Sequence, residues 1–217
     1  MIELLKWQTV TEPLRNALVL LMAEPVFHPF RLVGGTSLGL QLGHRMSIDI
    51  DLFTDSKYGS LDFNKIDAVL RVNFPYVSPM QNGVVGIGCF YFIGTNDNQA
   101  IKLDLYYTDR FIEDIIDING IRLASISEVA AMKMDIIQRI GRKKDFWDIH
   151  ALLDNLSLTA MIGLHEQRYP YTHDKDQIIR NLTDFSSADE DFNPICLQGK
   201  HWEIIKFEIA EQVNMIS

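Results

Sequence analysis

Two aspartates, Asp49 and Asp51, stand two positions apart in the segment SIDIDLF, residues 47–53. If this segment is a β-strand, alternation places both carboxylates on one face together with Ser47. The opposite face would carry the apolar side chains of Ile48, Ile50 and Leu52. Two adjacent carboxylates repel each other unless water or a cation lies between them. Oxygen ligands of this kind suit a hard cation, so the pair predicts a Mg2+ site.

A glycine pair, Gly34-Gly35, lies just upstream, between a short apolar run and a segment with helical spacing. Glycine lets the backbone turn sharply and approach a ligand closely, and Thr36 and Ser37 are placed to cap the helix that follows. The first amides of such a helix, with its dipole, form a site for phosphate. Phosphate beside metal-binding carboxylates is the apparatus of phosphoryl or nucleotidyl transfer.

Each half of this motif also has an ordinary explanation. A glycine turn before a helix is usually plain chain geometry, and an Asp-Ile-Asp strand is often the solvated face of a sheet edge. Their order and spacing in one stretch favour the functional interpretation.

A third carboxylate, Asp104, occurs in a second predicted strand. Residues 84–93 and 99–107 are rich in β-branched and aromatic side chains, flank the turn sequence GTNDN, and predict two antiparallel strands. In the second strand, Asp104 shares a face with Lys102 and Tyr106.

Three charged residues interrupt the apolar faces of two predicted helices. Ser125 begins a helix that continues to about Ile140 and carries Lys133, and the next, residues 144–153, carries Asp145 and Asp148. A buried lysine needs an anionic partner. Either the charges form a structural ion pair, or Lys133 contacts a nucleotide phosphate while the aspartates orient it.

The rest of the chain supplies the elements that must position these groups. Apolar periodicity predicts helices over residues 11–24, 62–74, 158–167, 175–185 and 201–213. Asn119-Gly120 predicts a tight hairpin, the last strand signal along the chain. The polar residues 186–194 read as a surface loop, and His44 is expected to cap the end of a helix.

Composition restricts the class of protein. At 217 residues with 47% hydrophobic and 23% charged side chains, the chain can form one core, or one core with a smaller helical part. A net charge of -9 argues against coating nucleic acid by bulk electrostatics. The one dense basic cluster, at Arg139 and residues 142–144, is either a solvated turn or the docking place of an RNA backbone or a triphosphate.

Other chemistries lack their motifs. Cys89 and Cys196 are isolated, no zinc-type spacing of histidines occurs, and no GxSxG nucleophile motif is present. The apolar run of residues 18–23 is too short to span a membrane and does not resemble a secretion signal. We therefore expect a cytoplasmic protein with no membrane partner.

Four separated runs together resemble the AbiEii/AbiGii nucleotidyltransferase toxin family, of the polymerase-beta-like nucleotidyltransferase superfamily. They are LVGGTSLGLQLGHRMSIDIDLF at residues 32–53, KLD at 102–104, AAMKMD at 130–135 and RKKDFWDIHALL at 142–153. The resemblance covers roughly residues 30–155. Thr36 stands where the superfamily usually has serine, and the chain is short for the family.

The resemblance implies an α+β fold, with a nucleotidyltransferase-like mixed β-sheet flanked by helices and followed by a helical C-terminal region. Its division would be residues 1–124 for the core with the metal and triphosphate site, and residues 125–217 for the helical part that completes the nucleotide cleft.

The family's site maps onto this sequence motif by motif. Gly34, Gly35 and Thr36 would hold the triphosphate, with Ser37, Arg45 and Ser47 beside them. Asp49 and Asp51 would bind Mg2+ or Mn2+, and Asp104 would be the third carboxylate and the base for an acceptor hydroxyl. Lys133 would contact the nucleotide, and Asp148, with Asp145 as a further candidate, would complete the site.

The function implied is transfer of a nucleotide from a nucleoside triphosphate to an RNA (in some relatives a tRNA end) or protein acceptor. Such an enzyme would be the toxin of a toxin-antitoxin or abortive-infection system, with a cognate antitoxin. Two alternatives stay open: transfer to a small hydroxylated molecule such as an antibiotic, and an inactive nucleotide- or partner-binding module. The presence of all the motif carboxylates favours an enzyme.

Overall fold

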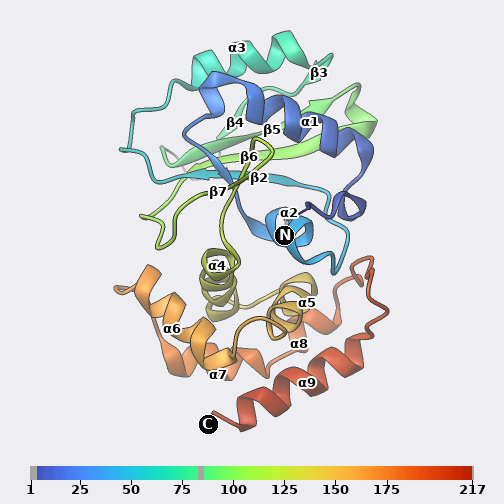
Figure 1. Ribbon diagram of the computed structural model, residues 1–217, viewed down its shortest axis with the longest axis vertical. Coiled ribbons are helices and arrows are strands. Elements are labelled where there is room, and N and C mark those ends of the chain that lie inside the picture. The colour runs from blue at the N-terminus through green and yellow to red at the C-terminus, as the bar shows by residue number, and fades with distance from the viewer. Residues whose placement is uncertain (1–3, 83–85, 217) are drawn as a thin grey trace.

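A computed structural model of the protein describes residues 4–82 and 86–216 and is built on one mixed β-sheet (Figure 1). The strand order is β3-β5-β6-β2-β1-β8-β7, with β4 paired to β5. The strands are β1 (Arg31–Leu32), β2 (Ile50–Thr54), β3 (Tyr76–Val77), β4 (Gln81–Asn82), β5 (Gly88–Gly94), β6 (Ile101–Tyr107), β7 (Ile116–Ile118) and β8 (Ile121–Leu123). The central pair β2 and β6 is parallel, as is β1 with β8, and the remaining pairs are antiparallel.

Helices lie on both sides of the sheet, and the chain after the last strand, β8, forms only helices and loops in the described residues. They are α1 (Glu12–Ala23), α2 (Gly34–Leu42), α3 (Phe63–Asn73), α4 (Ile126–Gln138), α5 (Lys143–Leu152), α6 (Leu158–Arg168), α7 (Lys175–Leu182), α8 (Ser186–Asp189) and α9 (Trp202–Asn214). In Figure 1, α1 and α3 cover the outer face of the sheet, whereas α2 lies on the side of the helical half. The predicted α+β fold with a helical C-terminal region is confirmed.

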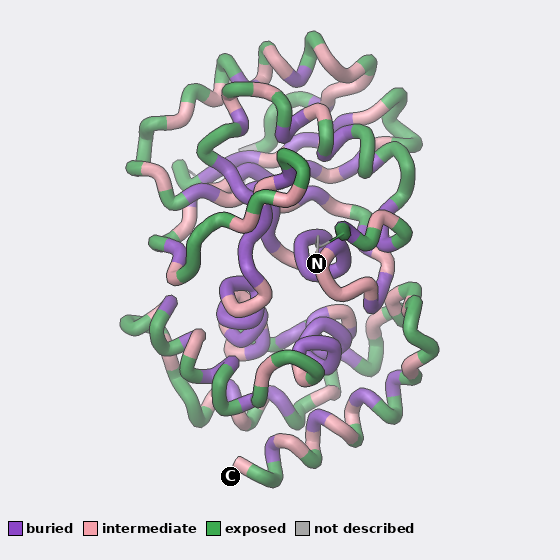
Figure 2. Tube along the Cα trace, viewed as in Figure 1, coloured by how far each residue is buried: buried purple, intermediate pink, exposed green. Residues whose placement is uncertain are grey.

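Two hydrophobic cores follow from this arrangement. In the first, apolar side chains of β2 and β6, among them Leu52 and Leu103, pack with Leu18 of α1. The second is centred on α4 and α5 and contains Ile137 and Trp202. The buried stretches in Figure 2 follow the central strands, α4 and α5. The division of the chain at residue 124 stays a prediction.

Local elements differ from expectation in a few places. Strand β2 begins at Ile50 and not at Ser47, so Ile48 does not share the buried face of Ile50 and is 68% exposed. Residues 186–189 form a helical turn, α8, where a loop was predicted. The strand predicted from Val84 begins at Gly88, and residues 84 and 85 lie outside the described residues. The two-residue strands β3 and β4 are too short for a periodic signal.

In residues 4–82 and 86–216, no helix combines the length and apolar character that a membrane span requires.

Candidate active site

The predicted site residues meet in a cleft of about 470 Å3 between the sheet with α2 and the helices α4 and α5. Eight of them line it, namely Gly34, Gly35, Arg45, Ser47, Asp49, Asp51, Lys133 and Asp145. Four do not, namely Thr36, Ser37, Asp104 and Asp148. Of these four, Thr36, Ser37 and Asp148 are completely buried. Asp104 retains slight exposure beside Asp51, with which it is in register.

The glycine turn lies directly against the carboxylate strand. Gly34 has a φ of +67°, and a Cβ atom on it would come 2.6 Å from Asp51 Oδ2. Only glycine combines this backbone conformation with so close an approach. Because β1 pairs with β2, the start of α2 is brought beside Asp51. The N-terminal turn of that helix thus borders the same cleft as the carboxylate.

Helix α2 begins earlier than predicted, so Thr36 and Ser37 do not cap it. Its N-cap is Val33, whose apolar side chain cannot cap the N–H groups of the first turn. Thr36 and Ser37 are fully buried inside the helix. Their side chains are therefore unsuited to holding a triphosphate, and that part of the prediction needs correction.

The buried hydroxyl of Thr36 instead fastens the segment that carries Asp49. Its Oγ1 atom lies 2.5 Å from the carbonyl oxygen of Asp49 and 2.7 Å from Ser47 Oγ. Asp49 precedes β2, and this contact holds its backbone against α2. Thr36 thus acts on the site through position and not by touching a ligand.

Two of the three carboxylates are neighbours across the parallel strands β2 and β6. Asp51 and Asp104 are in register, so their side chains share the face turned away from the first core. The pKa of Asp51 is raised to about 7, first because the carboxylate is buried and then because it is repelled by the carboxylates of Asp104 and Asp49. A cation would relieve this repulsion.

The residues that the structure describes do not form a preassembled three-carboxylate metal centre. In the described part of the chain, no three His, Cys, Asp or Glu side chains are arranged to hold a metal ion. Asp104 already pairs with Lys102, whose Nζ lies 2.5 Å from Asp104 Oδ2. The donor set nevertheless fits Mg2+, which binds through one or two carboxylates and takes its other ligands from water and substrate phosphates.

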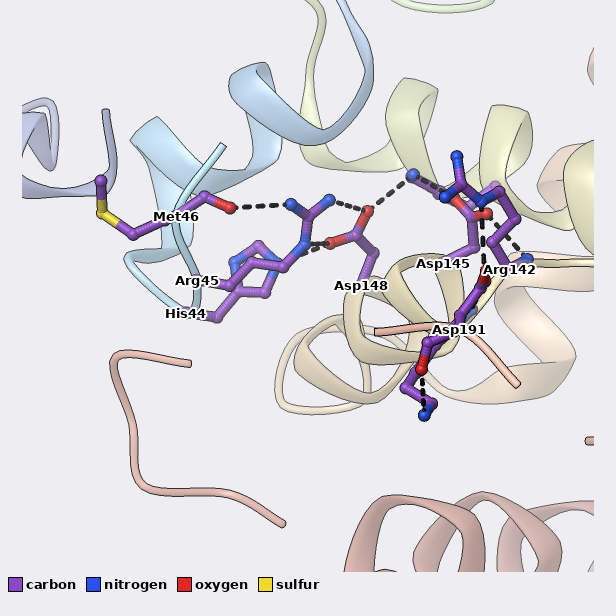
Figure 3. A network of polar contacts seen from close by, with 9 residues as sticks. His44, Arg45, Met46, Arg142, Asp145, Asp148 and Asp191 are labelled. Carbon is purple, nitrogen blue, oxygen red and sulfur yellow. Dashed lines mark hydrogen bonds and ion pairs between the residues drawn. The ribbon is translucent and has the colours of Figure 1, made fainter. Parts of the chain in front are cut away.

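A network of charges around Asp145 and Asp148 borders the cleft (Figure 3). Lys133 Nζ lies 2.7 Å from Asp145 Oδ1 and 2.6 Å from Asp148 Oδ2. Burial by itself would lower the pKa of Lys133, but these two carboxylates raise it. Lys133 is therefore a fixed ammonium ion at the cleft, held by the predicted aspartates.

Asp148 is the centre of this network and does not reach the cleft. It is completely buried and binds Arg45 through two bonds, Nε to Oδ1 at 2.6 Å and Nη2 to Oδ2 at 2.8 Å. His44 Nε2 lies 2.7 Å from Asp148 Oδ1. Although burial would raise the pKa of Asp148, Lys133 and Arg45 hold it well below its usual value. Asp148 is thus a positioning residue. His44 was predicted to cap the end of a helix, but its side chain binds Asp148.

Gly35 makes room for the guanidinium group of this network. A Cβ atom on Gly35 would come 2.3 Å from Arg45 Nη2. The second glycine of the motif is therefore required by packing against Arg45, whereas the first is required by the turn and by Asp51.

Further residues complete the cleft. Arg139, Arg142 and Lys144 line it, which gives the basic cluster of the sequence a place beside the carboxylates. The aromatic side chains of Phe53 and Tyr169 also line it. Tyr169 lies beyond the run of motifs and carried no signal in the sequence. Alternation had placed Lys102 on the strand face of Asp104, but its ion pair with Asp104 was not predicted.

Comparisons with known proteins find both a family and individual relatives. The family model described as nucleotidyl transferase AbiEii toxin, type IV TA system, matches residues 17–210. An uncharacterised protein of Aquifex aeolicus is 28% identical over 187 residues, which cover 82% of this chain and 84% of that protein.

Solved structures share the fold over nearly the whole chain. JHP933 from Helicobacter pylori has a TM-score of 0.58 at 18% identity, covering 95% of this chain and 93% of its own. MenT4, a nucleotidyltransferase toxin from Mycobacterium tuberculosis, has a TM-score of 0.56 at 13% identity, covering 93% of this chain and 82% of its own.

Proposed function

Because the chain belongs to the AbiEii nucleotidyltransferase toxin family, we propose that it is a Mg2+-dependent enzyme that transfers a nucleotide from a nucleoside triphosphate to RNA. The acceptor class includes tRNA, and the protein would be the toxin partner of an antitoxin in the cytoplasm. The observation that carries this proposal is the contact geometry between Gly34 and Asp51, which sets a helix N-terminus beside a carboxylate in one cleft.

Each part of the cleft has a chemical task in this proposal. The first-turn amides of α2 and the ammonium of Lys133 bind the triphosphate oxygens. Asp49 and Asp51, with Asp104 adjacent, would hold Mg2+, which supplies neutralisation of phosphate charge when bound. The acceptor hydroxyl oxygen forms a bond to the α-phosphorus, the bond to the bridging oxygen breaks, and pyrophosphate leaves. Asp104 is our candidate to receive the hydroxyl proton.

The positioning residues make this arrangement rigid. Asp148 holds both Arg45 and Lys133, so two cationic groups keep their places at the cleft without a ligand. Preorganised charge of this kind is worth more in catalysis than charge that must be gathered during the reaction.

Features of the cleft favour RNA over a small acceptor. A small-molecule transferase would be expected to present a deep acidic cleft, whereas here Arg139, Arg142 and Lys144 line the same space as Asp49 and Asp51. Cations that line the same space as the carboxylates suit a polyanionic acceptor. The retained carboxylates argue against an inactive binding module.

Incubation of the purified protein with Mg2+, total RNA and each α-labelled nucleoside triphosphate in turn tests the proposal. We expect the wild type to incorporate label into RNA. When Asp49→Ala and Asp51→Ala are combined, the rate of incorporation should fall by at least about 100-fold. An Asp154→Ala variant, at an exposed position after α5, is the control and should retain activity. Equal labelling by the wild type and the double variant would refute the catalytic role of the carboxylates.

A further inference from the structure

A second hollow of about 350 Å3 joins the cleft on the side of Asp49. We term it the side groove. It is lined by residues 45–49, Arg142, Lys144 and residues 191–195. Five of these residues also line the cleft, namely Arg45, Ser47, Asp49, Arg142 and Lys144. A molecule in the side groove would therefore lie next to a candidate catalytic carboxylate.

The outer wall of the side groove is a loop that is held at both ends. Asp191 Oδ2 accepts a hydrogen bond from the backbone N–H of Lys143 at 3.0 Å, and Lys143 Nζ donates to the Asp191 carbonyl at 2.5 Å. At the other end, the N–H of Met46 donates to the Ile195 carbonyl at 2.9 Å. Figure 3 shows Asp191 against the start of α5. The loop is thus attached to both halves of the site.

This anchored loop presents an aromatic ring entirely to solvent. Phe192 is 99% exposed, and Ile48 and Ile195, which line the same groove, are each 68% exposed. Apolar side chains that gather at the rim of a hollow, on a fixed backbone, mark a binding surface. Alternation had placed Ile48 on one strand face with Ile50, but its exposed side chain belongs to this surface.

Cations lie beside the aromatic ring. The Arg142 side chain is 66% exposed, with Nε 3.5 Å from Asp191 Oδ2, and Lys144 is half-buried between groove and cleft. The negative groups of the groove are Asp191, whose carboxylate also accepts from the Lys143 amide, and Asp49. An exposed ring with neighbouring Arg and Lys is the combination that binds single-stranded nucleic acid, by base stacking and phosphate contacts.

Resting on the proposed function, we propose that the side groove holds the acceptor, as the 3′-terminal nucleotides of a single-stranded RNA. One base stacks on Phe192, backbone phosphates lie at Arg142 and Lys144, and the terminal hydroxyl lies toward Asp49. A larger hollow of about 670 Å3, lined by residues 109–112 and 167–172, shares only Tyr169 with the cleft. It contains none of the motif carboxylates and is the weaker candidate for the acceptor.

Binding of a fluorescein-labelled single-stranded oligoribonucleotide of about ten nucleotides, followed by anisotropy in Mg2+, tests the groove directly. Removal of one base–aromatic stack in Phe192→Ala should weaken binding by about tenfold, and Phe192→Trp should restore it. Tyr171→Ala is the matched control, because Tyr171 is also 99% exposed but lines the other hollow. It should bind the RNA as the wild type does.

Further outcomes separate this inference from the proposed function. If Phe192→Ala and the wild type bind the oligoribonucleotide with equal affinity, the proposal that the side groove holds the acceptor is overturned. It is also overturned if the wild type does not bind the oligoribonucleotide. Wild-type affinity in Phe192→Leu also overturns it, because an apolar contact, such as one with a protein partner, would then suffice. Phe192-dependent binding without transfer from any nucleoside triphosphate sustains the groove and refutes the proposed function. Nucleotide transfer that is independent of Phe192 sustains the proposed function and refutes acceptor binding in the side groove.

Discussion

Asp51 is held where its neutral form is favoured, and this has a consequence for stability. Its pKa is about 7 in the folded protein, against 3.8 as the ordinary value, because of burial and the carboxylates of Asp104 and Asp49. Between about pH 4 and pH 7 the folded chain therefore keeps a proton that the unfolded chain has lost. The stability of the metal-free protein should fall as pH rises through this window.

The variant Asp51→Asn tests this at the residue scale. It removes the titrating group, so at about pH 8 it should be more stable than the metal-free wild type by up to about 4 kcal/mol, and the difference should vanish near pH 4. Urea unfolding in a chelator at both pH values measures it, with Asp154→Asn as the exposed control. The prediction would be contradicted if the difference in unfolding free energy between variant and wild type were the same at both pH values. Added Mg2+ should stabilise the wild type more than the variant.

At the scale of elements, the site depends on how α2 begins. The glycine at its start has a left-handed backbone and leaves no room for a Cβ beside Asp51. This single turn joins the phosphate-binding amides to the carboxylate strand. Its replacement should therefore disturb both functions at once.

We expect Gly34→Ala to cost about 1–3 kcal/mol of stability and to lower transfer by at least about tenfold, because it strains the turn and displaces Asp51. Gly163 in α6 offers a matched control, because a Cβ there would meet no atom within 4 Å. Gly163→Ala should be neutral or stabilising by up to about 1 kcal/mol, since alanine is the better helix former. Thermal unfolding and the labelling assay measure both effects. Identical losses in the two variants would show that the turn has no special role.

At the scale of the whole molecule, a sheet half and a helical half lie one above the other (Figure 1). Residues of both halves line the cleft. His44 and Arg45 follow α2, whereas Asp148 belongs to α5, and their contacts are buried. The backbone of residues 44–46 also pairs with residues 195–197. We expect these contacts to couple the two halves into one cooperative unit.

Asp148→Asn should therefore weaken the joint and not one half alone. Removal of one partner from a buried ion network costs about 3–5 kcal/mol, since Arg45 loses its counter-charge. In a Trp7→Phe background, fluorescence reports on Trp147 and Trp202 of the helical half, while circular dichroism reports on both halves. We expect the two urea transitions to coincide with Asp148 present and to separate in Asp148→Asn.

The exposed pair of Asp67 and Arg71 provides the comparison, because Asp67→Asn should cost less than about 0.5 kcal/mol and keep the transitions together. If Asp148→Asn shows one unchanged transition, the two halves are coupled by other contacts.

The sequence alone determined the features that follow from local periodicity and composition. The α+β order of elements, the antiparallel pair β5 and β6, and the capping of α4 by Ser125 were all predicted. So was the gathering of Gly34, Asp51 and Lys133 in one cleft, through four motifs in order. Glycine turns, alternation and helical spacing act over a few residues, which is why they can be read without coordinates.

Only the tertiary structure decided which groups a ligand can reach. Asp148 and Arg45 stand 103 positions apart, and their pairing depends on how α5 packs against the end of α2. The burial of Thr36, the exposure of Ile48 and the attachment of the loop carrying Phe192 likewise depend on where distant segments meet. Burial is set by packing between elements, and no local pattern encodes it. The sequence therefore predicted which chemical groups belong to the site, and the packing of the two halves determined where each of them lies.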